Sequence, residues 1–227
     1  MPPLPLVPGT LLDGYRLGPL LGRGEEGVVY HAVERLTRLP FALKLLHAPG
    51  REGRQLAART ARIFHKLRGT GAVATYHRCG RAGERVYLVF DRLDGVPLAP
   101  LLRRRRWSQA WTAEAACLLL HALARKLAAV HRCGLAIGDF TGGNNIVLVG
   151  GREPVFCDLD VGEPGFVNRD YAFDLELLAE LAINLAGVQP PCPTLQHAAW
   201  LIATQLERRP TRSRMTRLAK AIGQLPL

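Results

Sequence analysis

Three glycines near the start of the chain have the spacing of a phosphate-binding loop. The stretch from Leu21 to Val29 contains Gly-x-Gly-x-x-Gly-x-Val, built on Gly22, Gly24 and Gly27. Glycine lets the backbone approach phosphate oxygens without a Cβ in the way, and its N–H groups can cradle them. The pattern alone also fits a plain hairpin turn, or a dinucleotide-binding turn that leads into a helix. Because β-branched residues follow the glycines here, a second strand is favoured.

A lysine follows the glycine loop at the end of an apolar segment. Phe41, Ala42 and Leu43 precede Lys44. A lysine in this position usually lies on the surface with its charge in water. After a glycine loop, however, Lys44 becomes a candidate phosphate ligand, and the small Ala42 would leave room for a base. The two features together favour binding of a nucleotide triphosphate.

Acidic and amide side chains form a second group in the later half of the chain. Ile137 to Ile146 reads Ile-Gly-Asp-Phe-Thr-Gly-Gly-Asn-Asn-Ile, and Cys157-Asp-Leu-Asp ends a later apolar strand. Asp, Thr, Gly and Asn are also ordinary turn residues, so the loop alone is ambiguous. Asp158 and Asp160 are two apart, so an extended chain would direct both carboxylates to one side, where they could share a metal. The alternative, that Asp160 faces solvent, is equally open.

In this order, the motifs resemble those of the protein-kinase superfamily. The glycine loop and the strand ending at Lys44 are similar to the kinase glycine-rich loop and Val-Ala-Ile-Lys strand. Asp139 and Asn144 match the Asp-x-x-x-x-Asn catalytic loop, and Asp158 matches the metal-binding aspartate of Asp-Phe-Gly. The Gly-Asp form of the loop resembles compact atypical kinases such as the RIO type. The resemblance implies an α+β, bilobal fold with a β-rich N-lobe, a reduced helical C-lobe and a site in the cleft between them.

The resemblance implies an ATP site in the first lobe. Lys44 would contact the α- and β-phosphates, backbone groups near Asp91 and Leu93 would bind the adenine edge, and Phe90 would be the gatekeeper. The residues implied to bind the nucleotide are Gly22, Gly24, Gly27, Val29, Ala42, Lys44, Asp91 and Leu93.

The resemblance also implies the catalytic and metal residues. Asp139 would accept or orient the substrate hydroxyl, assisted by Lys44 and Asn144. Magnesium would be held by Asn144 and Asp158, with Asp160 as a further candidate. A helix aspartate would brace the catalytic loop; Asp174 and Asp170 compete for this role.

The chain departs from the family pattern in several places. Ile137-Gly138-Asp139 replaces His-Arg-Asp. The helix glutamate that pairs with the lysine in kinases is missing, and Thr60 stands at its position on the inward stripe. Glu52 is about 12 Å away along the helix, too far to substitute. Only Val161 to Arg169 is left for an activation segment, which makes peptide docking as in ordinary kinases doubtful.

The periodicity of the chain predicts two lobes after a short lead-in. Residues 1–11 are expected to be an extended lead-in, 12–92 the N-lobe and 93–227 the C-lobe. Strands are expected over 17–21, 27–33, 41–46, 86–90, 146–149 and 155–157. Helices are expected over about 52–67, 108–132 and 171–186, with Ser108 as the N-cap of the second and two weaker helices at the end.

Composition limits the class of protein but does not name a partner. The formal charge of +11 suits an anionic partner, although a run of arginines such as Arg103 to Arg106 is usually a solvated face. No segment has the roughly 18 apolar residues of a membrane span, and residues 1–8 do not resemble a secretory signal. The five cysteines form no Cys-x-x-Cys pair and are interpreted as reduced thiols, which favours a cytoplasmic location.

Three functions remain open from the sequence. The leading hypothesis is an atypical kinase that transfers the γ-phosphate of ATP to Ser or Thr hydroxyls with Mg²⁺, on a protein substrate or on itself. The second is a pseudokinase that binds nucleotide and regulates a protein partner, which the missing helix glutamate favours. The third is a small-molecule kinase, a class that shares the Gly-Asp loop. Nucleic acid is a less favoured partner.

Overall fold

The computed structural model describes residues 6–103, 112–160, 170–188, 192–205 and 212–225. The chain divides into two compact units. The first comprises Met1–Arg68 and Ala74–Leu93, and the second comprises Gly69–Val73 and Asp94–Leu227. Among the described residues, no helix is long and apolar enough to cross a membrane.

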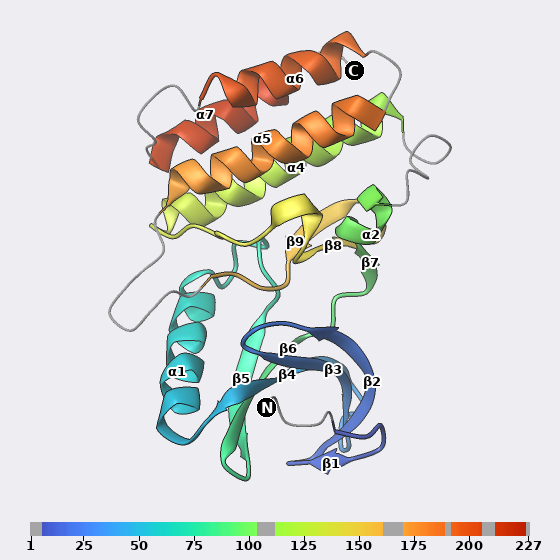
Figure 1. Cartoon of the computed structure of the whole chain (residues 1–227), viewed down its shortest axis with the longest axis vertical. Helices are drawn as coiled ribbons and strands as arrows, with labels where there is room; N and C mark the ends of the chain where they lie inside the picture. Colours follow the sequence, from blue (N-terminus) through green and yellow to red (C-terminus); the bar gives the residue numbers. More distant parts are fainter. Residues whose placement is uncertain (1–5, 104–111, 161–169, 189–191, 206–211, 226–227) are drawn as a thin grey trace. The chain divides into compact units, whose positions relative to one another are not determined.

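The first unit is a curled antiparallel sheet with one long helix (Figure 1). The six strands lie in the order β1-β2-β3-β4-β6-β5. Their bounds are β1 Leu11–Leu12, β2 Tyr15–Arg23, β3 Gly27–Glu34, β4 Pro40–Pro49, β5 Tyr76–Ala82 and β6 Arg85–Asp91. Helix α1, Gly50–Lys66, connects β4 to the later strands.

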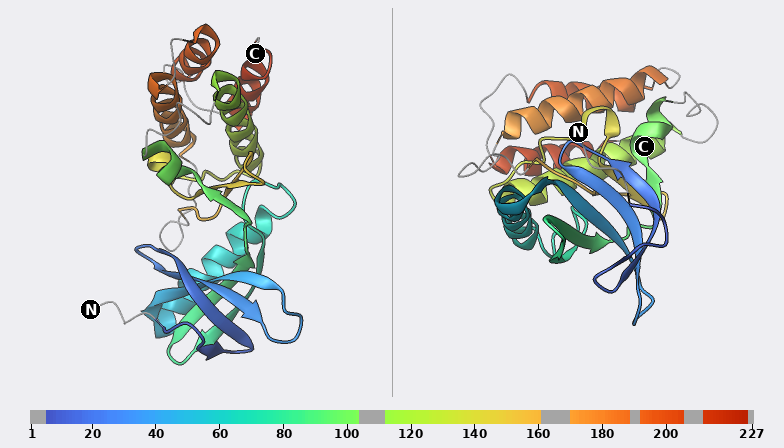
Figure 2. Two further views of the ribbon diagram at one scale, coloured as in Figure 1. Left: turned by 90° about the vertical axis from the view of Figure 1, so that its right-hand side faces the viewer. Right: turned by 60° about the horizontal axis from the view of Figure 1, so that its bottom comes forward.

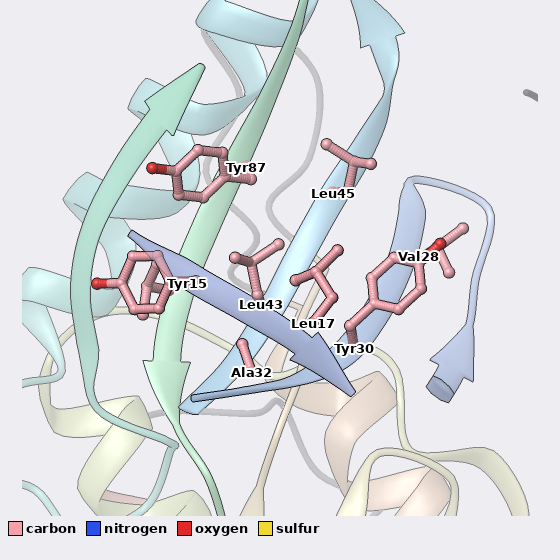
Figure 3. Packing of buried hydrophobic residues seen from close by; sticks show 9 residues of the cluster. Tyr15, Leu17, Val28, Tyr30, Ala32, Leu43, Leu45 and Tyr87 are labelled. Carbon is pink, nitrogen blue, oxygen red and sulfur yellow. The ribbon is translucent and has the colours of Figure 1, made fainter. Parts of the chain in front are cut away.

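One face of this sheet carries the core of the first unit (Figure 3). Tyr30 lies opposite Leu43 on the neighbouring strand, and Leu43 lies opposite Val89. Side chains alternate between the faces of a strand, so these three residues point to the same side. The full cluster is Tyr15, Leu17, Val28, Tyr30, Ala32, Leu43, Leu45, Tyr87 and Val89.

A polar cluster of Asp13, Arg78 and the hydroxyl of Tyr87 lies beside this core. The hydroxyl of Tyr87 donates to the carboxylate of Asp13, which also pairs with Arg78 at 2.6 Å. These partners lower the pKa of Asp13, the hydrogen bond from Tyr87 most of all, whereas burial raises the pKa of Tyr87 above its ordinary value. The ring of Tyr87 can therefore lie in the core while its hydroxyl keeps a hydrogen-bond partner.

The opposite face of the sheet receives α1. Phe64 of the helix meets Phe90 of β6 edge-on, with ring centroids 4.9 Å apart. The helix buries its stripe of Leu56, Thr60 and Ile63. Lys44 lies opposite Leu88, in the register that places it on the same face as Phe90.

The second unit is mainly helical, with one small sheet. Figure 2 shows two neighbouring helix pairs, α4 with α7 and α5 with α6. The helices are α2 Leu98–Arg103, α4 Ala113–Arg132, α5 Tyr171–Val188, α6 Pro193–Ala203 and α7 Arg212–Ile222. The three strands, ordered β7-β8-β9, are Gly95–Pro97, Ile146–Val149 and Glu153–Phe156. A short 3₁₀ turn, Thr141–Gly143, precedes β8.

The structure changes several details of the expected elements. The helix expected from Ser108 begins at Ala113, because the side chain of Thr112 accepts the N–H of Ala115 at 3.2 Å and caps it. The predicted start of this long helix is therefore wrong, and Thr112 is the residue that caps α4. Ser108 itself, the arginines at 104–106 and the activation segment 161–169 lie outside the described residues. Strands β1, β5 and β7 and helix α2 were not expected.

Leu43→Ala is predicted to lower the free energy of unfolding by about 2–5 kcal/mol, because it removes a fully buried side chain from the centre of the first-unit core. Leu36→Ala provides a matched control, since Leu36 is 93% exposed and should change stability by less than about 0.5 kcal/mol. Urea unfolding followed by circular dichroism measures both. Equal effects of the two variants would contradict the assigned core.

Candidate active site

The glycine-rich segment forms the hairpin between β2 and β3. Gly27 is required by packing, since a Cβ there would lie 2.5 Å from the carbonyl oxygen of Leu45. At Gly22 and Gly24, by contrast, a Cβ would meet no described atom within 4 Å. Packing among the described residues therefore does not explain these two glycines. Open space over a bare backbone is what a closely approaching ligand requires.

Lys44 lies beside this hairpin and is nearly buried. Its side chain is 7% exposed, and it lies opposite Val29 in the β3–β4 register. Val29 and Lys44 therefore share a face of the sheet with Ala42, two residues earlier. The structure thus brings together three of the residues predicted to bind the nucleotide.

The ammonium of Lys44 makes an ion pair with an acid of the glycine-rich hairpin. Nζ of Lys44 lies 2.6 Å from Oε2 of Glu26, whose side chain is 34% exposed. Glu26 directly precedes Gly27, and sequence analysis assigned it no role. The position of Glu26 within the glycine motif does not predict an ion pair, because glutamates in loops are usually solvated.

Helix α1 supplies no carboxylate at the expected position. Thr60 faces inward, as expected, with 1% exposure, and its hydroxyl donates to the carbonyl oxygen of Leu56 at 3.0 Å. Glu52, the acid of the first turn of α1, is exposed. The departure from the family pattern that the sequence indicated is therefore present in the structure.

The predicted adenine-binding segment ends β6. Phe90 is 6% exposed and packs between Phe64 and Tyr76. The N–H of Asp91 donates to the carbonyl oxygen of Thr75 at 2.9 Å, so this donor is used within the first unit. The roles of Asp91 and Leu93 in binding a base stay predictions.

In the second unit, a buried aspartate anchors the loop that carries Asp139. Asp174 of α5 is fully buried, and its carboxylate accepts the N–H groups of Ile137 at 2.9 Å and Gly138 at 2.8 Å. Nε2 of His131 lies 2.8 Å from the same carboxylate. A buried charge needs such a set of donors, so the two backbone bonds fix the loop one residue before Asp139.

The competing aspartate has a different role. Asp170 accepts the N–H of Phe173 at 3.0 Å and caps the start of α5. Of the two aspartates that the sequence left open, it is therefore Asp174 that braces the loop.

Backbone conformation explains the glycine before Asp139. Gly138 has φ of +74°, a region that other residues rarely adopt. A residue with a side chain there would be strained while its N–H was held by Asp174. The Gly-Asp sequence is thus matched to this loop geometry.

An asparagine holds Asp139 from the far end of the loop. Nδ2 of Asn145 donates to Oδ2 of Asp139 at 2.8 Å and to its carbonyl oxygen at 3.1 Å. Sequence analysis selected Asn144, the neighbouring residue that fits the family spacing, and that role stays a prediction. Asn145 has φ of +57°, a conformation that asparagine tolerates and that could be recognised only from coordinates.

Asp158 follows strand β9, which pairs with β8 directly after the loop. Cys157 donates its N–H to the carbonyl oxygen of Asn145 at 2.9 Å, which places Asn145 beside the start of the Cys157–Asp160 segment. Asp160 donates its own N–H to the carbonyl oxygen of Ile137 at 2.9 Å, so the segment is tied to both ends of the loop.

In the described part of the chain, no group of three His, Cys, Asp or Glu side chains is placed to hold a metal. Asp158 and Asn145 carry carboxylate and amide oxygens, the ligand types of Mg²⁺, an ion that keeps waters and takes only one or two protein carboxylates when phosphates complete its shell.

A pocket of about 360 Å³ lies elsewhere in the second unit, between α4 and α7. It is lined by Arg125, Lys126 and Lys220, among others, and Lys126 is paired with Glu153 at 2.5 Å. None of the predicted site residues lines this pocket, so it does not bear on their assignment.

Asp174→Ala is predicted to lower the free energy of unfolding by at least about 3 kcal/mol, because it leaves two backbone N–H groups and His131 without a buried charged acceptor. Asp170→Ala, which removes only a helix cap, should cost about 0.5–2 kcal/mol. Thermal unfolding of both variants measures the difference. A larger effect at Asp170 would contradict the assignment of Asp174 as the brace.

Sequence comparisons find similarity to kinases over part of the chain. No family model matches it. Human serine/threonine-protein kinase H1 is 30% identical over 84 residues, which are 37% of this chain and 20% of that protein. The Danio rerio homologue is 31% identical over a segment of the same length. The match therefore spans about a fifth of the length of these relatives.

Structural similarity covers nearly the whole chain. The kinase domain of Mycobacterium tuberculosis PknI superposes with a TM-score of 0.68 and 21% identity, over 97% of this chain and 99% of that domain. A variant of the same domain gives a TM-score of 0.70 with 20% identity and the same coverage. Because these identities are low, the comparison shows the fold, which confirms the α+β fold expected from the kinase motifs. The chain has the protein-kinase fold.

Proposed function

We propose that this chain is a compact, atypical protein kinase that transfers the γ-phosphate of ATP to serine or threonine hydroxyls, its own included. The observation that carries the proposal is the loop held between Asp174 and Asn145. The first accepts two backbone N–H groups before Asp139, and the second donates to Asp139 itself. Fixing both the backbone before Asp139 and the carboxylate of Asp139 suits a group that must meet a substrate hydroxyl in a defined orientation.

Asp139 is the proposed base in this reaction. Its side chain lies in an exposed part of the loop, so a substrate hydroxyl can approach it. The hydroxyl oxygen forms a bond to the γ-phosphorus, the bond from that phosphorus to the bridging oxygen of ADP breaks, and Asp139 receives the hydroxyl proton. The bond from Asn145 keeps the carboxylate oriented during the transfer.

Lys44 and the glycine-rich hairpin are proposed to bind the phosphates of ATP. The open space at Gly22 and Gly24 and the position of Lys44 next to Val29 and Ala42 support this role. Asp158 is proposed to hold Mg²⁺ with Asn144 or Asn145, and Asp160 remains a further candidate. The ion would neutralise charge on the transferring phosphate.

A pseudokinase is the second candidate function. The observation that favours it is Thr60, which leaves α1 without the acid expected to pair with Lys44. This alternative predicts nucleotide binding without phosphate transfer, together with regulation of a protein partner.

Asp139→Asn and Asp158→Asn are each predicted to reduce label transfer from γ-labelled ATP to protein by about 100-fold or more, since they remove the proposed base and metal ligand. Glu114→Gln is the matched control, because Glu114 is an exposed acid of the same unit in the first turn of α4 and should leave the rate within about twofold. The wild-type chain is assayed with Mg²⁺, with and without generic protein substrates.

The same assay compares the two asparagines. Asn145→Ala is expected to reduce transfer more than Asn144→Ala, because Asn145 donates hydrogen bonds to the carboxylate and the carbonyl oxygen of Asp139. Transfer that is absent from the wild-type chain, or that survives in both aspartate variants, would contradict the proposed kinase activity. Nucleotide binding with no transfer would favour the pseudokinase instead.

A further inference from the structure

The glycine-rich hairpin and Lys44 are joined by an ion pair that the family pattern does not contain. Lys44 is nearly buried, and a buried ammonium is stable only when an anion or a set of acceptors faces it. Oε2 of Glu26, at 2.6 Å from Nζ, supplies a negative charge at that position. The acid comes from the hairpin and not from α1.

Helix α1 has no residue that could take over this role without a shift. The inward position is Thr60, and its hydroxyl is already used by the carbonyl oxygen of Leu56. Glu52 is the acidic residue of α1, and it lies two turns earlier on an exposed position. The eight residues from Glu52 to Thr60 span about 12 Å along the helix, which exceeds the reach of a glutamate side chain.

The backbone of the hairpin holds Glu26 beside the lysine strand. The carbonyl oxygen of Glu26 accepts the N–H of His47 at 2.8 Å, and Gly24 donates to the carbonyl oxygen of Gly27 at 2.9 Å. Gly27 lies opposite Leu46, two residues beyond Lys44 on β4. The contact to Lys44 therefore starts from a residue whose main chain is already paired.

We propose that Glu26 is the positioning residue of Lys44 and replaces the carboxylate that α1 lacks. This inference rests on the proposed nucleotide-binding function of Lys44. An ammonium has three N–H donors, so a bond to Glu26 is compatible with bonds to phosphate oxygens. The hairpin would then both cover the phosphates and hold the lysine that contacts them, a coupling that ordinarily requires the helix.

The test compares Glu26→Gln with Glu25→Gln in two measurements. Glu25 is an exposed neighbour in the same hairpin, so its variant removes a negative charge from the loop and leaves the Glu26–Lys44 ion pair in place. The first measurement is the rate at which an amine-acylating reagent modifies Lys44 in the nucleotide-free protein, read by peptide mass spectrometry against the exposed Lys66. The second is the Kd of MgATP, and thermal unfolding checks that each variant is folded.

Glu26→Gln should raise the acylation rate of Lys44 about tenfold, because a nearby opposite charge favours the unreactive ammonium form by at least that factor. The same variant should weaken MgATP binding about tenfold, and Glu25→Gln should stay within about twofold in both measurements. Glu26→Asp, which keeps the charge on a shorter side chain, should lie between Gln and wild type. It also replaces Glu26→Gln as the test if that variant does not fold.

An unchanged acylation rate in Glu26→Gln would overturn the inference. Tighter MgATP binding in that variant would also overturn it, since Glu26 would then compete with the phosphates for Lys44. If the wild-type chain bound no nucleotide, the proposed function would fail, while the acylation rates would still decide whether Glu26 holds Lys44.

Discussion

The buried carboxylate of Asp174 determines the shape of the loop on which the proposed chemistry depends. A fully buried charge must be surrounded by donors, and the N–H groups of Ile137 and Gly138 provide two of them. This requirement fixes a backbone with φ of +74° at Gly138, which in turn explains a glycine where most kinases have arginine. Asn145 then orients Asp139 from the other end of the loop. The position of the proposed base therefore follows from one buried charge in α5.

A second buried charge organises the first unit. The antiparallel register of β3 and β4 places Lys44 on the face opposite the apolar cluster, next to Val29. The core of Leu43, Leu45 and Tyr87 keeps that register, because a shift by one residue would expose it. Lys44 is then held by Glu26 from the hairpin, where the family uses a helix glutamate. Each unit thus contains a buried ionic residue whose partner comes from a segment distant in the sequence.

Sequence reasoning predicted the elements with strong patterns and missed those fixed by tertiary contacts. The glycine hairpin, the Lys44 strand and the helix over α4 were recognisable from periodicity and spacing. Strand β5 was missed because it is largely polar and exposed, and α2 is too short to show a helical period. The start of α4 was misplaced because Ser108 and Thr112 are both good caps, and local sequence does not decide between them.

The site residues show the same division. Asp139 and Asp158 stand in recognisable motifs, and Asp174 was one of two candidates for the brace. Asn145 and Glu26 were missed because their contacts depend on a left-handed residue and on a hairpin, which spacing does not encode. Thr60 illustrates the opposite case. The loss of an acid there was visible in the sequence, but the substitute could be found only from the Lys44 contact.

The most direct test of this account is a calorimetric titration of the whole chain with ATP, with and without Mg²⁺, repeated on Lys44→Ala. The account predicts a single saturable site whose affinity increases with Mg²⁺ and which Lys44→Ala weakens severely, because Lys44 supplies the buried cation facing the phosphates. Heat that does not saturate, or equal affinity of Lys44→Ala and wild type, would contradict the account of a nucleotide site built on the glycine-rich hairpin.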